Sequence, residues 1–68
     1  MILSGARGKL VSVDAKNKTV RILRRSVEED YECEGDVNLG KLRPLIGKRV
    51  DLELRDFLVI GVTHRADD

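Results

Sequence analysis

The clearest pattern of hydrophobic and polar positions lies in residues 50–55, where apolar and charged side chains alternate. A period of two is typical of a strand with one buried face. After two charged residues comes the run Phe57-Leu-Val-Ile, which is too short for a helix and rich in residues that favour strands. The two segments together predict a hairpin in which Leu52 faces the core and Glu53 faces water.

The N-terminal part of the chain predicts a second hairpin. Residues 8–14 favour a strand, but Leu10 and Val13 can both face inward only if an extra residue lies between them. This predicts a β-bulge near Val11 and Ser12. A turn and a return strand, with Val20 and Ile22 on one face, are expected at residues 14–18 and 19–24.

The middle of the chain predicts a loop, a short strand and a short helix. After a loop at residues 25–29, Tyr31 and Cys33 alternate with acidic residues, which predicts a third strand. Apolar residues then recur at helical spacing between Asp36, a suitable N-cap, and Gly47, a suitable C-terminal stop.

The order strand, strand, strand, short helix, strand, strand resembles that of the OB-fold, including the bulged first strand and Leu45-Ile-Gly47 before strand four. A second resemblance is to the KOW motif of SH3-like barrels in ribosomal and transcription proteins. It is carried by Gly5-Ala-Arg-Gly8, Val13-Asp14, Val20 and Ile22. We therefore expect an all-β fold, a small five-stranded antiparallel barrel that is OB-like, with an SH3-like barrel as the alternative.

The length of 68 residues predicts one domain, spanning residues 1–68, with frayed ends at about 1–5 and 64–68. Charged residues make up 37% of the chain, above the roughly 25% of an average protein, and the scarcity of Asn and Gln is typical of thermophilic sources. The net charge is only +1, but residues 1–25 hold seven basic residues against one acidic, and residues 26–36 hold six acidic and no basic. The charge is therefore separated along the chain.

Candidate chemistry is sparse. One cysteine, Cys33, and one histidine, His64, form neither an internal disulfide nor a metal site, so we expect no metal and no cofactor. No nucleophile lies near His64 in the sequence, and we expect a protein that is not an enzyme. Cys33 is expected to be buried beside Tyr31.

The acidic stretch from Glu28 to Asp36 favours a solvated strand face over a metal site or an acid–base pair. We expect its side chains to pair across the sheet with Arg21 and with Arg24 or Arg25. The chain has no apolar run of signal-peptide or membrane-span length, which predicts a cytoplasmic protein with no membrane partner.

Two functions fit these features. The first is a non-enzymatic interaction or assembly module that binds itself or another protein, because the last strand is apolar on both sides. Self-association would use Phe57 and Val59; the alternative is that Ile2 and Leu3 or the short helix cover these two residues within the same chain. The alternative is a nucleic-acid-binding protein for RNA or single-stranded DNA, although the outward face of strand three is acidic and aromatic residues are few. Its contacts would be the basic loop residues Lys16, Lys18, Lys41, Arg43, Lys48 and Arg49.

Overall fold

The structure, a computed structural model, describes residues 1–65, and within them it has five strands and one short 3₁₀ helix. The elements are β1 (Leu3–Asp14), β2 (Thr19–Arg24), β3 (Val27–Glu32), η1 (Leu39–Leu45), β4 (Arg49–Arg55) and β5 (Leu58–His64). The expected all-β fold is confirmed. At the two ends where fraying is expected, Leu3 and His64 belong to strands, and residues 66–68 lie outside the described part.

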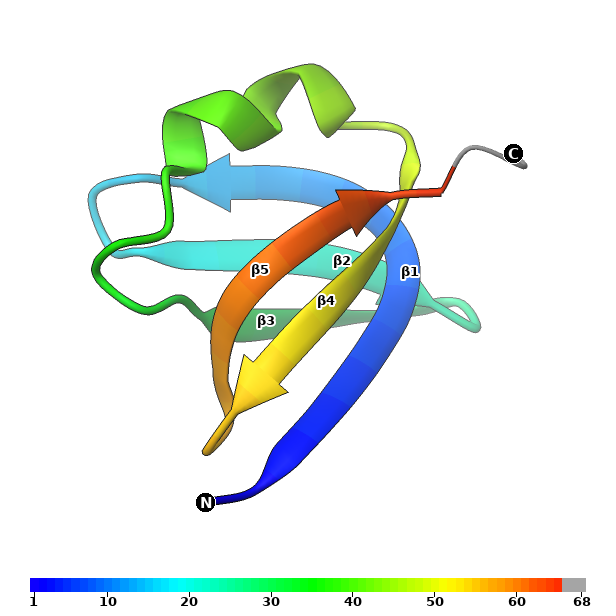
Figure 1. The fold of residues 1–68 in the computed structure, drawn as a ribbon. Helices are drawn as coiled ribbons and strands as arrows, with labels where there is room; N and C mark the ends of the chain where they lie inside the picture. Colours follow the sequence, from blue (N-terminus) through cyan, green and yellow to red (C-terminus); the bar gives the residue numbers. More distant parts are fainter. Residues whose placement is uncertain (66–68) are drawn as a thin grey trace.

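All strands belong to one antiparallel sheet in the order β3-β2-β1-β4-β5, which curls so that its two edge strands approach each other (Figure 1). These edges meet at a single parallel bridge between Cys33 and Val59, where the backbone N–H of Glu34 donates to the Val59 carbonyl at 2.9 Å. Along the rest of β3 and β5 no ladder joins them among the described residues, so hydrogen bonds do not close the sheet. We call this line between the two edge strands the seam.

Strand β1 is long because it serves two neighbours in succession. Its first part pairs with β4, from Leu3 opposite Arg55 to Lys9 opposite Arg49, and its second part pairs with β2. The register shifts between Leu10 and Ser12, which confirms the bulge expected from the hydrophobic pattern. Lys9 stands in both ladders, so β1 changes partner at this point.

Gly8 permits this change of partner. A Cβ atom at this position would lie 2.7 Å from the backbone carbonyl oxygen of Leu23 in β2, closer than a real Cβ can approach. The absence of a side chain therefore lets the two strands come together where β1 bends.

The core lies inside the curled sheet and takes residues from every strand. Leu10, Ile22, Val50 and Val59 have no exposed surface, and η1 covers one end of the interior with Leu39 and Leu42 (Figure 1). None of the helices within residues 1–65 has the length and apolar character needed to cross a membrane.

Two sequence expectations about the middle of the chain need correction. The loop expected at residues 25–29 is a two-residue turn at Arg25 and Ser26, both with positive φ (52° and 66°), so β3 begins at Val27. Such turns match the twist of a hairpin and usually contain Asn or Gly, which is why this sequence did not suggest one. The helix begins later, with Asn38 rather than Asp36 at its N-cap, and it is a 3₁₀ helix containing Pro44.

Strand β5 faces the core differently from the expectation. A second two-residue turn, at Asp56 and Phe57, starts the strand at Leu58, and a register shift opposite Glu53 and Leu54 leaves Ile60 unpaired. Because of this bulge, both Val59 and Val62 pack on the core.

The register of β4 predicts different outcomes for two adjacent truncations. Leu52→Ala should lower the free energy of unfolding by about 2 to 5 kcal/mol, because Leu52 is buried and its removal leaves a cavity. Glu53→Ala, at an exposed position, should stay within about ±0.5 kcal/mol. Denaturant titrations followed by circular dichroism test this; equal midpoints for the two variants would refute the register.

The contact at Gly8 predicts that even a methyl group there is harmful. Gly8→Ala should cost about 1 to 3 kcal/mol, because the obstructing atom is backbone and moves only with the β1–β2 ladder. Gly35→Ala is the matched control, since nothing lies within 4 Å of a Cβ there. Thermal midpoints of the two variants measure the difference, and a Gly8→Ala protein as stable as wild type would contradict the close approach.

Candidate nucleic-acid interface

A shallow groove on the outer face of the sheet gathers basic side chains. Its volume is about 460 Å³, and among the described residues no acidic side chain lines it. We call it the basic groove; its cationic residues are Arg7, Lys9, Arg24, Arg25, Arg49 and Arg65. A continuous positive surface of this kind attracts anions such as phosphate.

The topology explains why residues so far apart in sequence meet here. Lys9 has Leu23 of β2 on one side and Arg49 of β4 on the other. Arg24 ends β2 and Arg25 begins the turn, so both lie at the same end of the sheet. The backbone N–H of Arg65 donates to the Arg49 carbonyl at 3.0 Å, which brings in the end of β5.

Acidic neighbours neutralise only part of this charge. The Asp51 carboxylate lies 3.3 Å from Arg7 Nε and 3.3 Å from Arg65 Nη1, so one carboxylate is shared by two guanidinium groups. Arg24 Nε lies 3.8 Å from Glu29 Oε1. Lys9 and Arg25 are exposed and form no ion pair with another described residue. The groove therefore keeps an excess of positive charge although the whole chain is nearly neutral.

A second hollow continues the positive surface towards the start of β4. It shares Lys9 and Arg49 with the basic groove and adds Lys48 and His64. Together the two hollows extend the positive surface over the outer face of β1 and β4.

The nucleic-acid contacts expected from the sequence are only partly brought together. Arg49 lines the basic groove and Lys48 lies next to it. Lys16 and Lys18 belong to the β1–β2 turn, where Lys18 Nζ donates to the Gly35 carbonyl at 3.2 Å. The two remaining residues, Lys41 and Arg43, belong to η1, and neither lines the groove.

The acidic strand behaves largely as expected. Arg21 Nε and Nη2 donate to the Asp30 carboxylate at 2.7 and 3.2 Å, which holds the pKa of Asp30 below its usual value. Arg24 was expected to be engaged in the same way, but its contact with Glu29 is looser and its side chain lines the basic groove. Glu34 instead accepts from Arg55 Nη2 at 2.7 Å, across the seam.

Sequence reasoning missed five of the six groove cations: Arg7, Lys9, Arg24, Arg25 and Arg65. A partial signal existed, because Arg7 and Lys9 flank Gly8 at a spacing of two and so share one face of an extended strand. Their neighbours across the sheet could not be read from the sequence, because the pairing of β1 with β4 joins residues at opposite ends of the chain.

The self-association residues lie in different environments. Phe57 is 70% exposed, whereas Val59 is completely buried. The expectation that the two share an exposed face is therefore wrong for Val59. The reason is the register of the hairpin, which places Val59 opposite the buried Leu54 and so on the core face of the sheet.

The cysteine and the histidine are far from a shared site. Cys33 is buried at the seam, and this burial raises the pKa of its thiol. His64 is exposed at the end of β5, beside the basic groove. Among residues 1–65, no group of three or more His, Cys, Asp or Glu side chains is placed to hold a metal ion.

Burial of Cys33 predicts a slow thiol in the folded protein. At pH 8 a chromogenic disulfide reagent should react with native protein at least about tenfold more slowly than with denatured protein, because burial both blocks access and lowers the thiolate fraction. Stopped-flow absorbance with and without denaturant measures the two reaction rates. Equal rates would mean that the seam is open at Cys33.

A scan against models of protein families, a search of curated proteins and a search of solved structures each give no match for this chain.

Proposed function

We propose that this chain is a non-enzymatic nucleic-acid-binding module that holds a phosphate backbone in the basic groove. The observation that carries the proposal is the convergence of six cationic side chains on one groove, which no acidic residue among residues 1–65 lines. Phosphate contacts by Lys and Arg supply most of the non-specific affinity of nucleic-acid-binding proteins, and guanidinium groups can bind phosphate through two donors at once.

The topology supports placing the fold among OB-like barrels rather than SH3-like ones. We infer this from three features together: the central β1 pairs with both β2 and β4, η1 lies between β3 and β4, and β3 meets β5 in parallel. The basic groove nevertheless lies over β1, the end of β2 and β4, whereas the outward face of β3 carries Asp30 and other acids. The proposed contact surface therefore excludes the acidic outward face of β3.

Homomeric assembly, the first function considered from the sequence, stays a prediction with a weaker basis. Val59 is buried and supplies no outer surface, while Phe57 remains exposed next to the N-terminal strand. The backbone N–H of Ile2 donates to Asp56 Oδ1 at 2.8 Å, so the exposed Ile2 and Phe57 lie at the same corner. Sedimentation velocity over a wide range of protein concentrations tests for this assembly.

The proposal predicts binding that depends on groove charge. Lys9→Glu combined with Arg25→Glu should weaken binding of a labelled mixed-sequence oligonucleotide by at least about tenfold in low salt, because two unpaired cations become anions. For the wild-type protein, affinity should fall roughly 10- to 100-fold between 50 and 200 mM salt, as expected for three to five phosphate contacts. Fluorescence anisotropy measures both effects.

The matched control is Lys41→Glu combined with Arg43→Glu, which changes the net charge equally but lies on η1. It should weaken binding by less than about threefold, since those charges act from a distance. A larger loss in the η1 variant than in the groove variant would favour the loop contacts expected from the sequence. No measurable affinity of wild-type protein at 50 mM salt would overturn the proposed function.

A further inference from the structure

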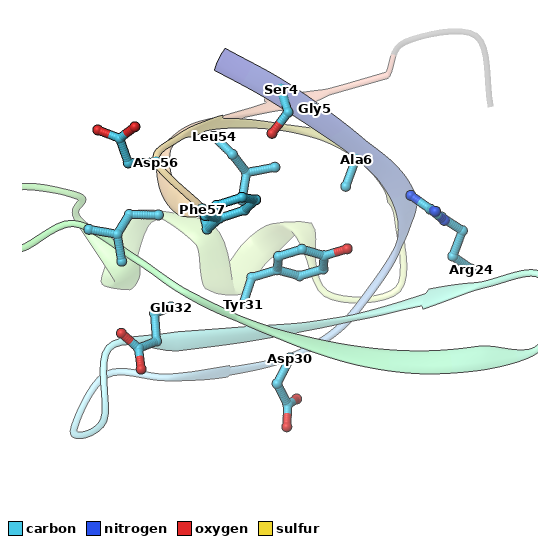
Figure 2. A pocket seen from close by; sticks show the side chains of 11 residues that line it. Ser4, Gly5, Ala6, Arg24, Asp30, Tyr31, Glu32, Leu54, Asp56 and Phe57 are labelled. Atoms are coloured by element: carbon cyan, nitrogen blue, oxygen red, sulfur yellow. The ribbon is translucent and has the colours of Figure 1, made fainter. Parts of the chain in front are cut away.

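A pocket of about 640 Å³ lies at the seam, beyond the basic groove (Figure 2). It occupies the region where β3 and the β4–β5 turn face each other without a ladder, and the first part of β1 forms its wall. We call it the seam pocket; the residues used below are Arg24, Tyr31, Glu32, Asp56 and Phe57.

The only two aromatic residues of the chain, Tyr31 and Phe57, both line this pocket. Figure 2 shows both side chains extending into its middle, Tyr31 from β3 and Phe57 from the turn before β5. The carboxylate of Asp30 points away from the middle of the pocket and is held by Arg21 at 2.7 Å. The interior is therefore aromatic although several carboxylates stand at the rim.

Phe57 is unfavourable for stability in two respects. Its φ of 69° lies in the left-handed region, which bulky residues rarely adopt, and 70% of its surface is exposed. Gly or Asn would suit this turn position better. A large apolar residue held in a strained conformation and exposed beside a pocket is a feature expected of a ligand contact.

The seam pocket is continuous with the basic groove. A third hollow shares Gly5 and Ala6 with the pocket, and Arg7 and Arg25 with the groove; it is also lined by Glu53 and by Asp51, which is paired with Arg7. Arg24 lines all three. A chain molecule that follows the groove past Arg24 therefore reaches the two aromatic rings.

We propose that the seam pocket receives a base of a single-stranded nucleic acid whose phosphates lie in the basic groove, so that the preferred ligand is a single strand and not a duplex. This inference rests on the proposed function. A base that is free of a duplex can stack on aromatic side chains, whereas paired bases stay within their own stack.

The seam pocket and the basic groove carry opposite charges and therefore suit different parts of the ligand. Glu32 and Asp56 at the rim of the pocket repel a phosphate, so the pocket admits the uncharged ring, and the phosphates stay over the cations of the groove. Asp56 is also occupied structurally, because its Oδ1 accepts the backbone N–H of Ile2 at 2.8 Å. Arg24 stands between the two sites, where the sugar–phosphate chain would turn inward.

The test compares three ligands of equal length: a single strand, the same strand with its bases removed, and a duplex. In 50 mM salt the intact single strand should bind at least about tenfold more tightly than the abasic strand, because one stacked base is lost. The abasic strand keeps the phosphates and so reports on the basic groove alone. When affinity is compared for equal numbers of contacted phosphates, the duplex should bind no more tightly than the abasic strand.

Tyr31 supplies a second readout, since it is the only tyrosine and the chain has no tryptophan. The intact single strand should quench its emission, and the abasic strand should not. Equal affinity for intact and abasic strands, with unchanged emission, would overturn the base site while leaving the proposed function intact. Absence of binding to all three ligands would overturn both.

The variant Phe57→Gly distinguishes a role of Phe57 in binding from a role in stability. Because glycine suits the positive φ, the denaturation midpoint should stay the same or rise, while the preference for the intact over the abasic strand should fall by about fivefold or more. Leu3→Ala, at a residue that is 67% exposed but outside the pocket, is the matched control and should keep the preference. An unchanged preference in Phe57→Gly would also refute the proposal.

Discussion

The rest of the structure depends on the close approach of β1 and β2 at Gly8. Strand β1 pairs first with β4 and then with β2, and where it bends its backbone lies close to that of β2. A Cβ atom on Gly8 would lie 2.7 Å from the Leu23 carbonyl oxygen, so the approach requires glycine. The bend curls the sheet and encloses the core. It also sets the outward residues next to Gly8, Arg7 and Lys9, on the convex side, where β2 and β4 contribute their own cations. The packing of the core and the gathering of cations on the outer face therefore both follow from the close approach at Gly8.

This arrangement places opposite charges on different parts of a nearly neutral molecule. Asp30 of β3 pairs with Arg21, and Glu34, just after β3, pairs with Arg55 at the seam, while the groove cations lie over β1, β4 and the end of β2. Exposed ion pairs contribute little to stability, so the separation matters more for ligand approach than for folding. An anionic polymer would meet the molecule from the side of β1, and repulsion by the β3 acids would limit the orientations in which it can bind.

Much of the fold could be predicted from the sequence, because period-two patterns identify strands that have one buried face. β2, the bulge after Leu10 and the inward position of Leu52 follow directly from such patterns. The two tight turns could not be predicted, since Arg25, Ser26, Asp56 and Phe57 adopt positive φ without the glycine or asparagine that usually marks it. The groove was missed for a different reason. Alternation shows which residues face outward, but not which distant strand lies alongside, so the six cations could not be assigned to one surface.

The pairing of β1 with β4 also determines the stage of synthesis at which this domain can fold. Leu3 pairs with Arg55, and Lys9 pairs with Arg49, so the central ladder connects segments that are synthesised at different times. During translation the β1–β2–β3 meander can form from neighbouring residues, yet β1 keeps one side unpaired until β4 has left the ribosome. Long-range pairing of this kind slows folding well below the rate of helical domains of similar size. Until β4 has been synthesised, the nascent chain therefore carries an open strand edge, with Ala6 and Leu10 uncovered.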